Sequence, residues 1–89
     1  MQEKKYYVYV LGSQKLSRLY IGQTKKLKER LKEHNFGRVR STKYYLPWQL
    51  IGCEVYNTRR EARKRENYLK SLKNKDYLLK TIKKVTDAG

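Results

Sequence analysis

With 89 residues, the chain is long enough for one small domain with a modest hydrophobic core. Lys and Arg number 23 against 8 Asp and Glu, and the resulting net charge of +15 excludes an acidic or charge-balanced surface. No apolar run approaches the roughly 20 residues of a membrane span, and the single cysteine excludes an internal disulfide. We therefore expect a cytoplasmic protein that binds no membrane and has a polyanionic partner, nucleic acid.

Two short apolar runs near the N-terminus, residues 7–11 and 19–22, predict an antiparallel β-hairpin, because they are rich in tyrosine and β-branched side chains. The alternation of a strand places Tyr9 on one face of the first run. If the register brings Tyr20 and Gly22 to that same face, two phenols lie beside a glycine that leaves room for a ligand backbone.

A helix is predicted over residues 25–34, with Thr24 as its N-cap and Gly37 ending it in a left-handed conformation. Its apolar stripe faces the sheet, and Arg30 and His34 flank this stripe. From this position Arg30 can reach back over the tyrosines of the hairpin, although a surface arginine lying along the stripe is the simpler interpretation.

Residues 38–45 show no periodicity, and they alternate basic, hydroxyl and aromatic side chains. This composition suits contacts to phosphates and stacked bases, and it equally suits an ordinary mobile basic loop. After Pro47, residues 48–56 predict a third strand whose pairing the sequence leaves open. The clearest apolar face of this strand consists of Ile51, Cys53 and Val55, and the carboxylate of Glu54 lies on the other face.

A capping box, Thr58 followed three residues later by Glu61, begins the next predicted helix. Its buried stripe contains Ala62, Leu69 and Leu72. Glu66 lies inside this stripe, and a carboxylate on a buried face needs a partner because burying it unpaired is costly. The partner is expected to be a cation such as Arg30 or a divalent metal ion.

A last helix is predicted to begin at Asn74 or Asp76, with Tyr77, Leu78, Ile82 and Val85 as its apolar positions. The element order β-β-α-β-α-α predicts an α+β fold, a three-stranded sheet with an antiparallel hairpin flanked by three helices. We expect one domain over residues 1–85 and a short tail at 86–89.

Two phenols, an arginine, a histidine and one inward-facing glutamate are the groups that phosphodiester hydrolysis requires. A base must take a proton from water, a hard cation must polarise the phosphate, and a positive group must stabilise the developing charge. One carboxylate can hold a single Mg²⁺ or Mn²⁺ that keeps most of its waters. His34 is the only histidine and cannot form a zinc site by itself.

The same residues resemble the GIY-YIG nucleases. Tyr7-Val8-Tyr9 and Tyr20-Ile21-Gly22 resemble the two tripeptides that name this family, the first departing from the pattern at Tyr7 and Val8. Arg30 and His34, one helical turn apart, match the family's arginine and histidine on the first helix. The segment from Ala62 to Leu69 matches its Ala-x-x-x-Glu-x-x-Leu pattern, with Glu66 as the metal-binding glutamate.

The resemblance covers nearly the whole chain, so the chain is similar to small stand-alone bacterial members and to the nuclease domain of the excision-repair incision subunit. It departs from many relatives at Gln23, where a lysine is common, and at its C-terminal end, where Asn74 stands outside the matching context. These departures bear on catalytic rate and not on the fold.

By resemblance, Tyr9 and Tyr20 position and deprotonate the nucleophilic water, and either can be the base. Arg30 would bind the scissile phosphate, His34 would assist, and Glu66 would hold the metal. We expect a divalent-metal-dependent endonuclease with no small-molecule cofactor, acting on DNA in preference to RNA. The alternatives are a nucleic-acid-binding module with little cleavage and, third, a basic adaptor for an acidic protein. The expected nucleic-acid contacts are Gln23, Lys25, Arg38, Arg40, Thr42, Lys43 and Tyr44.

Overall fold

The computed structural model describes residues 5–84, and its elements follow the predicted order β-β-α-β-α-α. The strands and helices are β1 (Tyr6–Ser13), β2 (Leu19–Thr24), α1 (Leu27–Asn35), β3 (Trp48–Tyr56), α2 (Arg59–Ser71) and α3 (Lys75–Thr81), with a short 3₁₀ turn η1 (Lys43–Tyr45) before β3. Val85 and the tail expected at 86–89 lie outside the described residues. None of the described helices is long and apolar enough to cross a membrane.

The three strands form one antiparallel sheet in the order β2-β1-β3. β1 is therefore the central strand, and β3 pairs with it, which the sequence had left open. In the hairpin, Tyr9 is opposite Gly22 and Leu11 is opposite Tyr20. Because residues directly opposite each other share a face, Tyr9, Tyr20 and Gly22 lie on one face, as the register hypothesis required.

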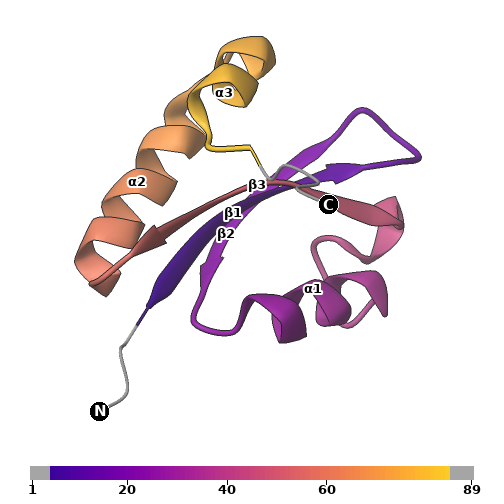
Figure 1. The fold of residues 1–89 in the computed structure, drawn as a ribbon. Helices are drawn as coiled ribbons and strands as arrows, with labels where there is room; N and C mark the ends of the chain where they lie inside the picture. Colours follow the sequence, from indigo (N-terminus) through magenta and orange to yellow (C-terminus); the bar gives the residue numbers. More distant parts are fainter. Residues whose placement is uncertain (1–4, 85–89) are drawn as a thin grey trace.

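The sheet is the middle layer of the molecule, with α1 on one face and α2 and α3 on the other (Figure 1). β1 is consequently buried on both faces. Val8 and Val10 pack with α2 and α3 in one core, whereas Tyr9 and Leu11 pack with Trp48 in a second core under α1. This second core carries the polar residues of the candidate site.

The apolar face predicted for the third strand is wrong in part, because a register shift between Val10 and Leu11 interrupts the pairing of β1 with β3. Ile51 packs with the core under α2, whereas Cys53 is opposite Tyr9 and so lies on the α1 face. Val55 is 51% exposed. A bulge reverses the alternation of side chains along a strand, and this sequence gives no local sign of one.

The helix ends agree with the prediction at three of four points. Thr58 and Asn74 cap α2 and α3 by accepting hydrogen bonds from backbone N–H groups, and Gly37 has a φ of 75° after α1. The Thr24 cap is wrong, since α1 begins at Leu27 and the Thr24 hydroxyl instead accepts from the N–H of Lys26 in the turn before it.

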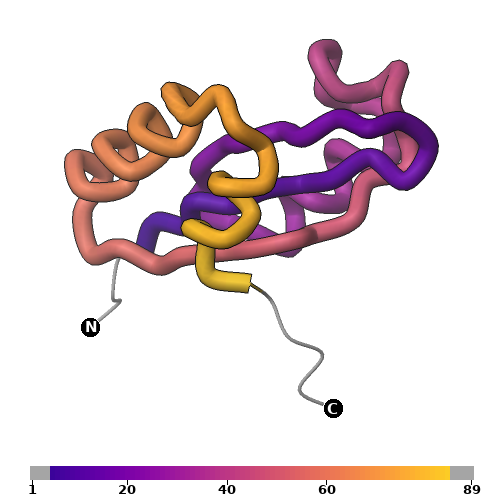
Figure 2. The backbone as a smooth tube through the Cα atoms, turned by 90° about the horizontal axis from the view of Figure 1, so that it is seen from above, coloured from indigo at the N-terminus to yellow at the C-terminus, as the bar shows by residue number. Residues whose placement is uncertain are grey.

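The loop between α1 and β3 lies beside the tip of the β1–β2 hairpin (Figure 2). The Ser13 hydroxyl donates to the carbonyl of Tyr45 at 2.7 Å, and the N–H of Gln14 donates to the carbonyl of Pro47 at 2.9 Å. The end of the segment for which a mobile loop was one of the two expectations is therefore tied to the sheet.

Candidate active site

The phenol of Tyr9 lies across β2 at Gly22. A Cβ atom at Gly22 would lie 2.7 Å from the Tyr9 Oη and 2.8 Å from its Cζ. The space that we expected to admit a ligand backbone is thus filled by the Tyr9 ring, and Tyr9 itself is only 1% exposed. Glycine is needed here for close approach of another side chain, so the expected open platform of two phenols is wrong for Tyr9.

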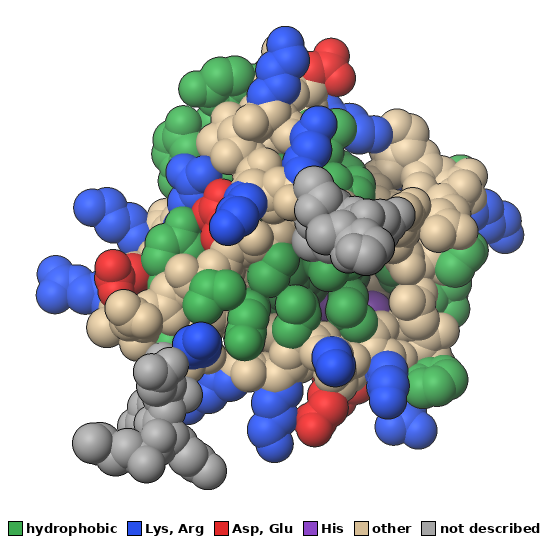
Figure 3. Space-filling model, viewed as in Figure 1, with side chains coloured by type: hydrophobic (Ala, Val, Ile, Leu, Met, Phe, Trp, Pro, Cys, Tyr) green, Lys and Arg blue, Asp and Glu red, His purple; other side chains and the backbone are tan. Residues whose placement is uncertain are grey.

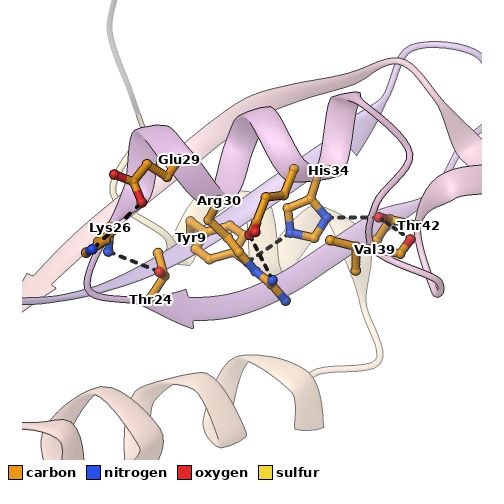
Figure 4. Close-up of polar contacts among 9 residues, drawn as sticks. Tyr9, Thr24, Lys26, Glu29, Arg30, His34, Val39 and Thr42 are labelled. Carbon is orange, nitrogen blue, oxygen red and sulfur yellow. Dashed lines mark hydrogen bonds and ion pairs between the residues drawn. The ribbon is translucent and has the colours of Figure 1, made fainter.

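A buried chain of hydrogen bonds runs from Tyr9 through His34 to Thr42 (Figure 4). The Tyr9 Oη is 3.0 Å from the His34 Nε2, and the His34 Nδ1 is 2.9 Å from the Thr42 Oγ1. Thr42 donates its own proton to the carbonyl of Val39 at 3.3 Å, so its oxygen accepts from His34. The proton of the neutral ring is therefore assigned to Nδ1, and Nε2 accepts the Tyr9 hydroxyl proton.

The pKa values of Tyr9 and His34 are both displaced so that both groups are neutral near pH 7. Burial raises the pKa of Tyr9 to about 12, against an opposing hydrogen bond from Arg30. Burial, together with the positive charge of Arg30, lowers the pKa of His34 to about 4. A neutral phenol bonded to a neutral imidazole can pass a proton along but does not hold a charge at rest.

Stability should therefore fall as the pH drops from about 6.5 to about 4. The pKa of His34 lies below that of an unfolded histidine, so the unfolded chain binds more protons in this window. The loss should approach roughly 3 kcal/mol at the acid end. Urea unfolding measured from pH 7 to 5 tests this directly, because His34 is the only histidine. A His34→Gln protein should show a flat profile over the same range, and a flat wild-type profile would contradict the assignment.

Arg30 projects from α1 toward Tyr9 (Figure 4). Its guanidinium pairs with the Glu33 carboxylate at 3.1 Å, and the Arg30 side chain is 37% exposed. It is thus held at the site while remaining accessible to an anion. The ring of Tyr20 packs on that of His34, with the ring centres 4.8 Å apart. Among residues 5–84, no side chain is hydrogen-bonded to the Tyr20 hydroxyl, so this hydroxyl is available to a ligand.

Glu66 lies on the α2 side of β2, and its partners differ from those expected. The amide of Gln23 donates from Nε2 to the Glu66 Oε1 at 2.8 Å, and the Lys70 ammonium is 2.8 Å from the Glu66 Oε2. The expected pairing with Arg30 is not formed, because Arg30 pairs with Glu33. The negative charge of Glu66 makes only a minor contribution to raising the Tyr9 pKa, after burial and Tyr20.

The other carboxylate considered from the sequence, Glu54, is committed to the fold. It accepts two hydrogen bonds from Arg65, at 2.8 and 3.1 Å, and one from the Tyr56 hydroxyl at 2.6 Å. It also accepts from the N–H of Lys83, and these contacts lower its pKa against the opposing effect of burial. Glu54 therefore ties β3 to α2 and to the segment after α3.

A groove of about 470 Å³ lies beside β2, at the edge of the sheet, and reaches Arg30. The Lys25 ammonium nitrogen and the Arg59 guanidinium carbon both lie over the ring of Tyr6, each 5.3 Å from its centre. Cations outnumber carboxylates along its walls, which suits a phosphate backbone. The lining residues are Gln23, Thr24, Lys25, Lys26, Glu29, Arg30, Glu33 and Arg59.

Comparison with known proteins identifies the architecture. The family model described as the GIY-YIG catalytic domain matches residues 5–82. The chain belongs to the GIY-YIG family. It is 39% identical over 77 residues to a UPF0213 protein of Bacillus licheniformis, covering 85% of this chain and 78% of the relative. It is 37% identical over 83 residues to a UPF0213 protein of Streptococcus pyogenes, covering 92% of this chain and 89% of the relative.

A solved structure of the same kind is the solution NMR structure of a UPF0213 protein from Bacillus halodurans, with a TM-score of 0.49 and 25% identity over 86% of this chain and 94% of that one. Membership of the GIY-YIG family confirms the resemblance drawn from the sequence. The family is of nuclease type, which suggests a nucleic-acid substrate, and its nucleases are generally divalent-metal dependent.

Within this GIY-YIG domain, the residues expected to contact nucleic acid lie in two groups. Gln23 and Lys25 line the groove at Arg30, whereas the exposed members of the α1–β3 loop lie at the other end of α1; these are Arg38, Arg40, Lys43 and Tyr44. Thr42 does not belong with them, because it is 1% exposed and serves His34. Basic side chains are spread around the face shown in Figure 3, with few acidic ones among them.

Sequence reasoning missed two residues near the candidate site, Arg59 and Lys70, and gave a third, Thr42, the wrong role. Arg59 enters the groove beside Lys25, and Thr42 fixes His34 from a loop without periodicity. The Lys70 ammonium forms an ion pair with the carboxylate of Glu66. Of these, only Lys70 carried a usable signal, since a glutamate and a lysine four residues apart on a helix are neighbours.

Proposed function

We propose that this protein is a divalent-metal-dependent endonuclease that hydrolyses phosphodiester bonds in nucleic acid. The observation that supports this most strongly is the buried chain of hydrogen bonds that joins Tyr9 to His34 and His34 to Thr42. They leave the imidazole ready to accept a proton from Tyr9, on the face where Arg30 can bind a phosphate.

In this mechanism Tyr9 passes a proton and is not a standing phenolate. As the attacking water gives its proton to the Tyr9 Oη, the hydroxyl proton of Tyr9 moves to the His34 Nε2, so the hydroxide equivalent forms at the phosphate. Thr42 keeps the ring in the tautomer that makes this transfer feasible. Tyr20 would orient the water or the substrate. Its ring packs on that of His34, but its hydroxyl is not hydrogen-bonded to the imidazole and so does not pass it a proton.

Substrate binding itself would improve the base. The charge of Arg30 is one cause of the low pKa of His34, and a phosphodiester bound to Arg30 would neutralise this charge. The pKa of His34 should then rise only part of the way, because burial, the larger cause of its low value, remains. Even this partial rise favours proton transfer when substrate is present. Arg30 would meanwhile stabilise the additional negative charge of the transition state.

The donor set near Glu66 fits one hard divalent cation. The Gln23 Oε1 is buried and accepts no hydrogen bond from residues 5–84. Exchanging the oxygen and nitrogen of this amide would place Oε1 against the negative Glu66 carboxylate, and two acceptors repel each other. Nε2 is therefore assigned as the atom that faces Glu66. Within the described residues no three His, Cys, Asp or Glu side chains gather. Glu66 and Gln23 would therefore hold the ion with water completing its shell, and the ion would supply Lewis-acid polarisation of the phosphate.

Lys70 should compete with this cation, because its ammonium contacts the Glu66 carboxylate. Lys70→Met should therefore tighten Mn²⁺ binding by up to about fivefold, as expected when a pair worth up to about 1 kcal/mol no longer opposes the ion. Titration calorimetry with Mn²⁺ measures the change, and Lys64→Met is the matched control. Lys64 is an exposed lysine on the same helix that lines a different hollow. Equal effects of the two variants would assign the change to net charge and not to competition.

The proposal is tested by incubating the protein with labelled single-stranded, flapped, branched and duplex DNA and RNA, with Mg²⁺, Mn²⁺ or EDTA. Cleavage within the strand that requires a divalent ion is the expected result. Salt-sensitive binding with no cleavage under any of these conditions would favour the second function, a nucleic-acid-binding module on the same fold, which the basic groove also supports.

A further inference from the structure

Two aromatic side chains at the end of α1 are unusually exposed. Phe36 is 71% exposed and Tyr44 is 73% exposed. No other large hydrophobic side chain among residues 5–84 exceeds 52%, the value for Tyr77. Neither ring packs in either core. We call the pair Phe36 and Tyr44 the aromatic platform.

The aromatic platform is held together by the turn after α1. Gly37, with its φ of 75°, turns the chain directly after Phe36, and a Cβ atom at Gly37 would lie 3.8 Å from the Cβ of Lys43, the neighbour of Tyr44. The backbone N–H of Lys43 donates to the carbonyl of Val39 at 3.0 Å. The two rings are thus brought to one region of the surface by an ordered backbone.

Each ring of the aromatic platform has its own cation. The Arg38 guanidinium carbon lies 5.7 Å from the centre of Phe36, and the Lys43 ammonium lies 5.1 Å from the centre of Tyr44. An aromatic face beside a positive charge matches the two parts of a nucleotide, a base that stacks and a phosphate that pairs. An apolar protein partner would gain nothing from these cations, and a chain of net charge +15 repels basic partners.

The Phe36 end of the aromatic platform adjoins the candidate active site. A shallow hollow of about 270 Å³ is lined by Phe36 and Arg38 together with Glu29 and Glu33 of α1. The same two glutamates line the groove at Arg30. A strand that occupies the groove can therefore run along α1 and reach the aromatic platform without leaving the surface.

We propose that Phe36 and Tyr44 stack on unpaired bases, so that the favoured ligand is a nucleic acid with a single-stranded segment. In a duplex the faces of the bases are already covered by their neighbours, and only unpaired or terminal bases can stack on a side chain. The substrate preference rests on the proposed nuclease function, but the binding preference does not.

The test is fluorescence anisotropy in EDTA with labelled single-stranded DNA, single-stranded RNA and duplex DNA of about 20 nucleotides, longer than one stacking site requires. Leucine in place of both rings (Phe36→Leu with Tyr44→Leu) keeps apolar volume and charge but removes the π faces. Tyr77→Leu is the matched control, since Tyr77 is an exposed tyrosine on α3.

The double variant should bind single strands at least tenfold more weakly, because stacking contributes about 1–3 kcal/mol per base. The affinity of the double variant for duplex DNA should stay within twofold of wild type, and so should the slope of its affinity against salt concentration. Every affinity of Tyr77→Leu should also stay within twofold of wild type. Equal losses for single strands and duplex, or no loss for either, would overturn the proposal. The DNA and RNA arms show which strand is preferred.

Because no metal is present in this assay, its outcome is independent of cleavage. A protein that cuts nucleic acid but whose double variant keeps its affinity would refute the aromatic platform and leave the nuclease function standing. A protein that cuts nothing but whose double variant loses single strands selectively would refute the nuclease function and support the aromatic platform.

Discussion

Replacing Arg30 by alanine is expected to lower the cleavage rate by about 10²–10³-fold, the usual effect of removing one group that stabilises charge in a transition state. The protein should remain folded, since the Arg30 side chain is 37% exposed and alanine is favourable in a helix. Single-turnover cleavage at saturating Mg²⁺ measures the first effect, and thermal unfolding measures the second.

The same variant provides a readout that does not depend on activity. Because the charge of Arg30 lowers the pKa of His34, Arg30→Ala should raise this pKa, which an NMR titration of the single imidazole detects. Lys28→Ala, which removes an exposed cation from the same helix, is the control and should alter neither quantity. A folded Arg30→Ala protein with wild-type activity would remove Arg30 from the site.

Glu66→Gln should abolish metal-dependent cleavage, with a loss of at least about 10²-fold, because the cation would lose its charged protein ligand. Stability should change little. The contact that is lost is with Lys70, whose side chain is 52% exposed and returns to water, and exposed pairs contribute only about 0–1 kcal/mol. The destabilisation of several kcal/mol expected if Glu66 were paired with a buried cation does not apply to this arrangement.

Two measurements separate these roles of Glu66. Mn²⁺ should raise the melting temperature of the wild-type protein and leave that of Glu66→Gln unchanged. Asp76→Asn, which removes an exposed carboxylate from α3, should behave like wild type. A Glu66→Gln protein that melts several degrees lower and still cuts with the same metal dependence would make Glu66 a scaffold residue.

Much of the fold could be predicted because its determinants are local. The tyrosine-rich hairpin, the Thr58 capping box and Gly37 each depend on a few neighbouring residues, and each is confirmed. The bulge that separates Ile51 from Cys53 could not be predicted, because it depends on how β3 fits β1. The start of α1 at Leu27 was missed since Thr24 can serve a turn as readily as a helix.

The candidate site divides in the same way. The resemblance indicated Tyr9, Tyr20, Arg30 and His34, and the fold brings these four residues together. The role of Thr42 depends on a hydrogen bond between a loop and a helix, so its hydroxyl was interpreted as a surface contact. Burial of Tyr9 was likewise hidden, because only the structure shows its ring lying over Gly22.

The central claim is that Tyr9, by passing its proton to His34, is the group that activates water. Single-turnover cleavage by Tyr9→Phe and Tyr20→Phe compares two phenols on the same face, of which only Tyr9 is bonded to the imidazole. Tyr9→Phe leaves the His34 Nε2 unpaired at a cost of about 1–3 kcal/mol, so unfolding curves must first show both variants folded at the assay temperature. We expect a loss of about 10²–10⁴-fold for Tyr9→Phe and of about tenfold or less for Tyr20→Phe. Full activity in folded Tyr9→Phe, or a larger loss in Tyr20→Phe, would contradict it.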